Sequence, residues 1–127
     1  MKNLLLILFI TLAFSCNKTT ADPEPQTVQE IVQGGFWFDQ WDFKHYFHAD
    51  GSYDVKHVNE VMGCDGSGYY EMSTTDITIF VEYECSTGIW EYRFSNVQYV
   101  STEEWSANWE CISSGPCAEI VMQMTKP

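Results

Sequence analysis

From residue 34 onward, apolar and polar residues alternate along several stretches of the chain. In DITIFVEYEC (residues 76–85), every second residue from Ile77 to Cys85 is apolar or a cysteine. Residues 88–95, 104–111 and 118–125 alternate in the same way. A period of two is typical of a β-strand with one buried face. A helical period is absent, apart from a short turn near residues 25–32, so we predict an all-β fold built as an antiparallel meander.

The strand pattern also predicts hairpin registers. Asp50-Gly51 separates two aromatic stretches, FKHYFHA and SYDVKHV, and is typical of a hairpin turn. A tight turn at residues 74–75 would place Met72 opposite Ile77 and Cys64 opposite Cys85. A slip of one residue would move every apolar side chain to the other face, so this register is favoured. Glycines at positions 63, 66 and 68 leave open a bulge near Cys64.

The last two stretches form a second candidate pair. Placing Trp109 opposite Ile120 also puts Ala107 opposite Met122, and both pairs join apolar residues. The two cysteines of this hairpin, Cys111 and Cys117, miss that register by one residue, which a bulge in the turn would absorb. We favour a disulfide between Cys111 and Cys117 because they are close in sequence, although four cysteines can pair in three ways. Zinc ligation is disfavoured, since the chain has no CxxC.

The N-terminus is strongly apolar over residues 4–14, directly after Lys2 and Asn3. Eleven residues are too few to span a bilayer, which needs about 20. Their length and flanks are those of a signal-peptide core. A buried N-terminal helix is disfavoured because a polar segment with Pro23 and Pro25 follows at once.

Residues 13–16, Ala-Phe-Ser-Cys, resemble the lipobox of bacterial lipoproteins. The resemblance implies cleavage before Cys16 and acylation of that cysteine, which would anchor the chain to a membrane. We therefore expect a signal peptide at 1–15, a lipidated cysteine and tether at 16–30, and a β-domain at 31–127. Lipidation would leave four cysteines, Cys64, Cys85, Cys111 and Cys117, for two disulfides in an oxidising compartment.

Charge excludes one class of partner. The chain has 6 Lys and Arg against 18 Asp and Glu, a net charge of −12. Such a domain repels phosphate backbones, so we expect no nucleic-acid partner.

Four short motifs, in order, carry a resemblance to a family. They are Gly35-Phe36-Trp37, the hairpin from Phe47 to Tyr53, the segment from Gly68 to Met72, and the closing segment from Val121 to Lys126. Together they resemble bacterial lipocalin-like lipoprotein domains. The resemblance implies a closed or nearly closed barrel of about eight strands, with room for one small ligand. Because the chain is short for a lipocalin, a flattened barrel filled by side chains remains an alternative.

Aromatic residues supply the candidate binding site. Phe36 to Trp109 contains 18 aromatic residues, some of which must form the core. Trp37, Trp41, Trp90 and Tyr92 are candidates to line a cavity for an apolar, aromatic or sugar-like ligand. Asp39 and His45 share a strand face with Trp37 and Trp41, and either polar side chain would need hydrogen-bond partners if buried.

Metal binding and catalysis have weak support. His45 and His48 point to opposite faces of one strand, and residues 65–68 lack the ligand pattern of a calcium loop. None of the common nucleophile, zinc-protease or phosphate-loop motifs occurs. We expect no metal, no cofactor and no enzymatic activity.

The resulting expectation is a monomeric binding protein in the envelope of a Gram-negative cell. Its lipid would sit in the outer membrane, and its domain would face the periplasm or the cell surface. The ligand would be small and apolar or aromatic. Two alternatives remain: a module that binds or inhibits an envelope protein through exposed aromatics, and a structural lipoprotein without a ligand.

Overall fold

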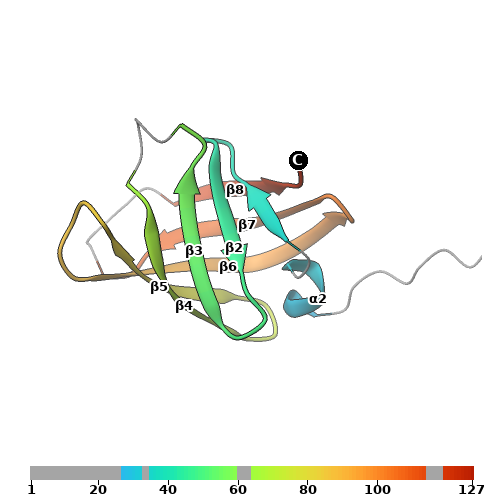
Figure 1. Cartoon of the computed structure of the whole chain (residues 1–127). Coiled ribbons are helices and arrows are strands. Elements are labelled where there is room, and N and C mark those ends of the chain that lie inside the picture. The colour runs from blue at the N-terminus through green and yellow to red at the C-terminus, as the bar shows by residue number, and fades with distance from the viewer. Residues whose placement is uncertain (1–26, 33–34, 60–63, 114–118) are drawn as a thin grey trace, which may run out of the picture.

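The computed structural model describes residues 27–32, 35–59, 64–113 and 119–127 (Figure 1). One short helix precedes eight strands, and each strand pairs with the next until the last returns to the first, as a closed barrel. The elements are α2 (Val28–Val32), β1 (Phe36–Phe38), β2 (Phe43–Phe47), β3 (Ser52–His57), β4 (Gly66–Met72), β5 (Ile77–Tyr83), β6 (Ile89–Ser101), β7 (Glu104–Cys111) and β8 (Ile120–Thr125). The predicted all-β meander of eight strands is confirmed. Among the described residues, no helix is long and apolar enough to cross a membrane.

The predicted registers are also confirmed. In the β4–β5 pair Met72 lies opposite Ile77, and Cys64 forms a disulfide with Cys85. The described β4–β5 ladder runs without a bulge from Gly66 to Met72. Gly68 has another role, because a Cβ there would collide with the backbone carbonyl of Phe80 on the facing strand. Only glycine lets these two strands approach so closely.

The registers of the other two predicted hairpins are confirmed as well. Phe47 faces Tyr53 across the turn that contains Gly51, whose φ of 90° favours glycine. In the β7–β8 pair Trp109 lies opposite Ile120 and Ala107 opposite Met122. Cys111 is disulfide-bonded, and its predicted partner Cys117 lies outside the described residues.

One end of the barrel is filled by large side chains. Trp37, Phe94 and Trp105 are at most 1% exposed and meet edge to face, with ring centroids 6.0 Å apart for Trp37–Trp105 and 5.6 Å for Phe94–Trp105. Helix α2 lies at this end (Figure 1) and buries Val28 and Val32. The Trp37 indole N–H donates to the Val32 carbonyl at 2.8 Å, which fixes the helix to the core. We call this the closed end.

Helix α2 begins with a capping box. The Thr27 hydroxyl accepts from the Glu30 backbone N–H at 3.2 Å, and the Glu30 carboxylate accepts from the Thr27 N–H at 3.0 Å. This reciprocal pair satisfies two backbone donors that a short helix would otherwise leave free. The predicted boundary between tether and domain, after residue 30, therefore falls inside a helix that is already part of the fold.

A side chain extends the seam that closes the barrel. Strand β1 has three residues, and among the described residues its ladder with β8 pairs Phe38 with Thr125. Beyond this pair, the Gln40 carboxamide donates to the Val121 carbonyl at 2.9 Å and accepts from the Gln123 N–H at 3.0 Å. Gln40 thus bonds to the β8 edge as the backbone of a longer β1 would.

We expect Gln40→Ala to lower the free energy of unfolding by about 1–2 kcal/mol, since two hydrogen bonds to the backbone are lost. Urea unfolding measures the change, and hydrogen exchange of the Gln123 amide should accelerate. Gln98→Ala is the matched control. This glutamine is also exposed, but its carboxamide donates to the Asn96 side chain, so its loss should change stability by less than about 0.5 kcal/mol. Equal effects of the two substitutions would contradict a role for Gln40 in the seam.

Candidate ligand-binding site

The barrel is hollow at the end opposite α2. The meander brings four connections to this end: β1–β2, β3–β4, β5–β6 and β7–β8. We call this end the mouth; in Figure 1 the β5–β6 connection lies far from α2. Two pockets open here and share Phe43 and Tyr83 in their walls. The large side chains that fill the closed end are not among the residues that line these pockets.

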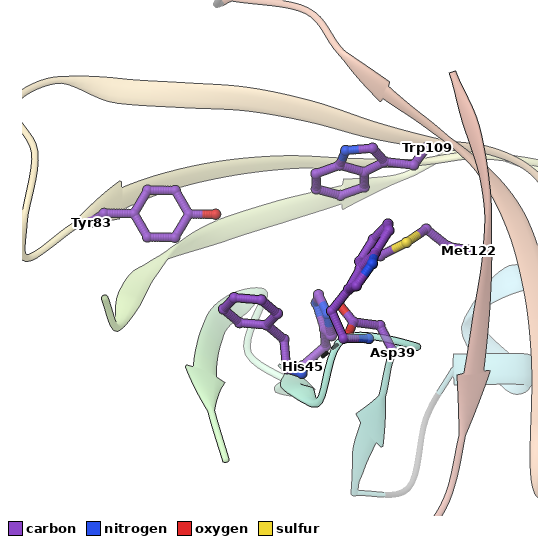
Figure 2. A pocket seen from close by; sticks show the side chains of 7 residues that line it. Asp39, His45, Tyr83, Trp109 and Met122 are labelled. Atoms are coloured by element: carbon purple, nitrogen blue, oxygen red, sulfur yellow. Dashed lines mark hydrogen bonds and ion pairs between the residues drawn. The ribbon is translucent and has the colours of Figure 1, made fainter. Parts of the chain in front are cut away.

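The first pocket, which we call the Asp39 pocket, has a volume of about 120 Å³. Figure 2 shows Tyr83, Trp109 and Met122 arranged around the space next to Asp39 and His45. The walls come from the β1–β2 turn and from strands β2, β5, β7 and β8, and consist of Asp39, Trp41, Phe43, His45, Tyr83, Trp109 and Met122. Asp39 and Met122, which are 83 positions apart in sequence, therefore converge on one cavity.

The second pocket, the Cys85 pocket, is larger and more open, with a volume of about 350 Å³. It lies against the disulfide that joins the β3–β4 and β5–β6 connections. Its walls are Phe43, Cys64, Tyr83, Cys85, Ser86, Trp90 and Tyr92. The Trp90 indole N–H donates to the Ser86 hydroxyl at 3.0 Å, which orients one of the aromatic walls.

Asp39 organises the turn that borders the first pocket. Its Oδ1 accepts from the backbone N–H groups of Trp41 at 2.8 Å and Phe43 at 3.0 Å. An aspartate that bonds to the backbone two residues ahead is a common turn-forming device. Asp42 closes the turn with a φ of 64°, in the left-handed region that Asp tolerates. The turn holds Trp41 over the pocket, although its side chain is 46% exposed.

The other oxygen of Asp39 begins a buried chain of hydrogen bonds. Asp39 Oδ2 lies 2.9 Å from His45 Nε2, and His45 Nδ1 lies 2.6 Å from the Tyr53 hydroxyl. All three residues are buried. Burial raises the pKa of Tyr53 well above its ordinary value, so its hydroxyl keeps its proton. His45 therefore links the β1–β2 turn to β3, with Asp39 at Nε2 and Tyr53 at Nδ1.

Aromatic groups on the other side of the cavity are partly open to solvent. Tyr92 stacks on Trp109 with ring centroids 4.5 Å apart. The Tyr83 hydroxyl is directed into the cavity (Figure 2). Burial raises the pKa of Tyr83; the neighbouring Tyr92 and then the negative charge of Asp39 act in the same direction.

Three of the four aromatic residues predicted to line a cavity lie at the mouth. Trp41 lines the Asp39 pocket, and Trp90 and Tyr92 line the Cys85 pocket. Trp37 lies at the closed end, where it packs on Trp105 and α2. Four further lining residues were not among the predicted cavity residues: Phe43, Tyr83, Trp109 and Met122. Counting the hairpins would have placed the last inward-facing residues of β5 and β7 near one another at the same end of the barrel.

The histidines do not converge. His45 is buried, whereas His48 is exposed and lies 2.8 Å from the Asp54 carboxylate. His57 packs edge to face on Phe43, with ring centroids 4.8 Å apart. Within the described residues, no three His, Cys, Asp or Glu side chains are placed to share a metal ion.

Comparisons with protein-family models, curated proteins and solved structures returned no match.

We expect Tyr53→Phe to lower the free energy of unfolding by about 1–3 kcal/mol at pH 7, because His45 Nδ1 loses its buried hydrogen-bond partner. Alkaline pH provides a second readout. The unfolded chain ionises its tyrosines above about pH 10, whereas folded Tyr53 stays protonated, so its stabilising effect is lost as pH rises through that range. Above pH 10 the free energy of unfolding of the wild type should therefore fall by up to about 1.4 kcal/mol more per pH unit than that of Tyr53→Phe.

Denaturant unfolding from pH 7 to 11 checks both effects. Tyr69→Phe is the matched control, since Tyr69 is half exposed on the outer face of β4. Its stability should follow that of the wild type at pH 7. If the free energy of unfolding falls with pH equally steeply in the wild type and in Tyr53→Phe above pH 10, folded Tyr53 does not keep its proton as we infer.

Proposed function

We propose that this chain is an exported, lipid-anchored, lipocalin-like binding protein of the cell envelope. Its ligand would be a small apolar or aromatic molecule held at the mouth, and its work would be binding rather than catalysis. One observation carries this proposal: the barrel is filled at one end and hollow and lined with aromatics at the other.

The contrast between the two ends supports binding. At the closed end, Phe94 and Trp105 are fully buried. At the mouth, Trp90, Tyr92 and Trp109 are only partly buried and border open cavities. Each square ångström of apolar surface removed from water contributes about 25 cal/mol. A ligand that covers these rings would gain the stabilisation that the protein alone leaves unrealised.

The Cys64–Cys85 disulfide supports both the site and the compartment. It joins two connections of the mouth, and the Cys85 backbone N–H donates to Cys64 Sγ at 2.9 Å. A cross-link at this place reduces the freedom of loops that border an unfilled cavity. Structural disulfides persist in exported proteins and are rare in the cytosol, which agrees with the signal-peptide pattern at residues 1–15.

The position of α2 supports the anchor. If Cys16 carries the lipid, residues 16–26 connect it to Thr27, a span of at most about 40 Å. Thr27 precedes α2 at the closed end. The membrane attachment would therefore lie opposite the mouth and leave it accessible.

A second candidate function rests on exposed apolar residues at the mouth. Trp41, Val58, Ile89 and Ile112 come from four different connections or their flanks and are 46%, 50%, 64% and 39% exposed. Exposed apolar groups that gather on one face are typical of protein-interaction sites. This favours an envelope protein as the alternative occupant of the mouth.

For the ligand, we expect saturable binding of the neutral dye N-phenyl-1-naphthylamine to the unlipidated mature chain that carries Cys16→Ser, followed by dye fluorescence. Trp90→Ala should weaken binding about tenfold, because it removes one wall of the Cys85 pocket. Tyr69→Ala, on the outer face, should leave the affinity unchanged. Equal affinities for the two variants, or no saturable binding, would contradict a ligand site at the mouth. The protein-interaction and structural alternatives would then take precedence.

For the anchor, we expect Cys16→Ser to move the protein from the membrane fraction to the soluble fraction of a Gram-negative host and to abolish labelling by radioactive palmitate. Stable anchoring requires the acyl chains that only this cysteine would carry. Asn17→Ser, one residue further on, is the control and should remain in the membrane. Retention of Cys16→Ser in the membrane would contradict the lipoprotein proposal.

A further inference from the structure

Aromatic rings from separate parts of the barrel surround the Asp39 pocket. Trp41 comes from the β1–β2 turn, Phe43 from β2, Tyr83 from β5 and Trp109 from β7. The face of an aromatic ring is the negative end of its quadrupole and attracts cations. These four residues line one cavity of about 120 Å³, and we call them the aromatic cage.

The same cavity is bordered by a buried carboxylate. One oxygen of Asp39 accepts from two backbone N–H groups, and the other lies 2.9 Å from His45 Nε2. Within the described residues, His45 is the only basic side chain within ion-pair distance of Asp39. Among the described residues that line the two pockets, none is Lys or Arg. The Asp39 carboxylate therefore has no permanently charged cation beside it, in a setting of low polarity where charges act strongly.

The rim of the mouth is also negatively charged. The described residues of its four connections include five carboxylates and no Lys or Arg: Asp39, Asp42, Asp65, Glu84 and Glu119. An acidic rim raises the local concentration of cations and repels anions.

We infer that the mouth binds an organic cation whose methylated or quaternary ammonium group occupies the Asp39 pocket, with its apolar remainder extending into the Cys85 pocket. The inference rests on the proposed function and names the chemical class of the ligand. The aromatic walls and the buried carboxylate both favour a positive charge at the same point. A methylated ammonium fits better than a primary one, because it needs no hydrogen-bond acceptors beyond those of the cage.

The test compares two small molecules of the same shape. Choline carries a trimethylammonium group, and 3,3-dimethylbutan-1-ol carries an uncharged tert-butyl group in its place. Calorimetry at low salt, with the unlipidated mature chain that carries Cys16→Ser, should show choline binding at least tenfold more tightly than the neutral alcohol. Added salt should weaken choline binding. The indole N–H resonance of Trp109 should shift with choline.

Variants test whether choline binds in the Asp39 pocket. Trp41→Leu removes one ring of the cage at a half-exposed position and should reduce choline affinity several-fold. Asp39→Asn keeps an oxygen for the turn and removes the charge, so it should abolish the preference for choline over the alcohol. Tyr69→Leu replaces an aromatic on the outer face, where it stacks on Phe80, and should bind choline as the wild type does.

The outcomes separate this inference from the proposed function. If N-phenyl-1-naphthylamine binds but choline does not, or if the alcohol binds as tightly as choline, the mouth is a neutral apolar site and the inference is overturned. A choline preference that survives in Trp41→Leu and Asp39→Asn also overturns it, because the cation then binds elsewhere. If neither the dye nor choline binds, the proposed function fails as well.

Discussion

The Asp39 carboxylate connects the fold of this barrel to its site. One oxygen holds the β1–β2 turn through two backbone N–H groups, and the other bonds to His45, which bonds to Tyr53 on β3. Burying a carboxylate is costly unless hydrogen bonds replace its water, and bonds to a charged acceptor are the stronger kind. This β1–β2 turn also positions Gln40 against β8 and Trp41 over the cavity. The closure of the barrel and the shape of the mouth therefore depend on the same buried group.

The two ends of the barrel divide stability and binding between them. At the closed end, tryptophan and phenylalanine side chains interdigitate and α2 covers the opening, as expected where packing density is high. At the mouth, the inward side chains leave cavities between them. A small domain buries a smaller fraction of its surface than a large one, so its core contributes less to stability. The Cys64–Cys85 disulfide and the Asp39 network lie at the hollow end, where side-chain packing contributes least.

Much of the fold could be predicted because its signals are local. Alternation identifies the inward face of each strand, and the pairing of Cys64 with Cys85 agrees with a register that keeps that face consistent. Alternation does not give depth along the barrel axis, so it could not separate Trp37 in the core from Trp90 at the mouth. The contact between Gln40 and β8 joins residues 81 positions apart and has no sequence signature. The capping box of α2 was a local signal that the polar composition around it obscured.

The choice of aspartate at position 39 is more informative than the turn that it forms. An asparagine would accept the same two backbone N–H bonds, since turns use Asn and Asp alike. Its amide would also bond to His45 Nε2 if the imidazole carried a proton on Nδ1 and donated it to the Tyr53 hydroxyl. Geometry therefore requires an oxygen at this position but not a charge. The charge strengthens the bonds but also adds desolvation cost, in a cavity bordered by Trp41, Phe43, Tyr83 and Trp109. A negative charge that the fold itself does not need is the feature that binding of a cation would explain.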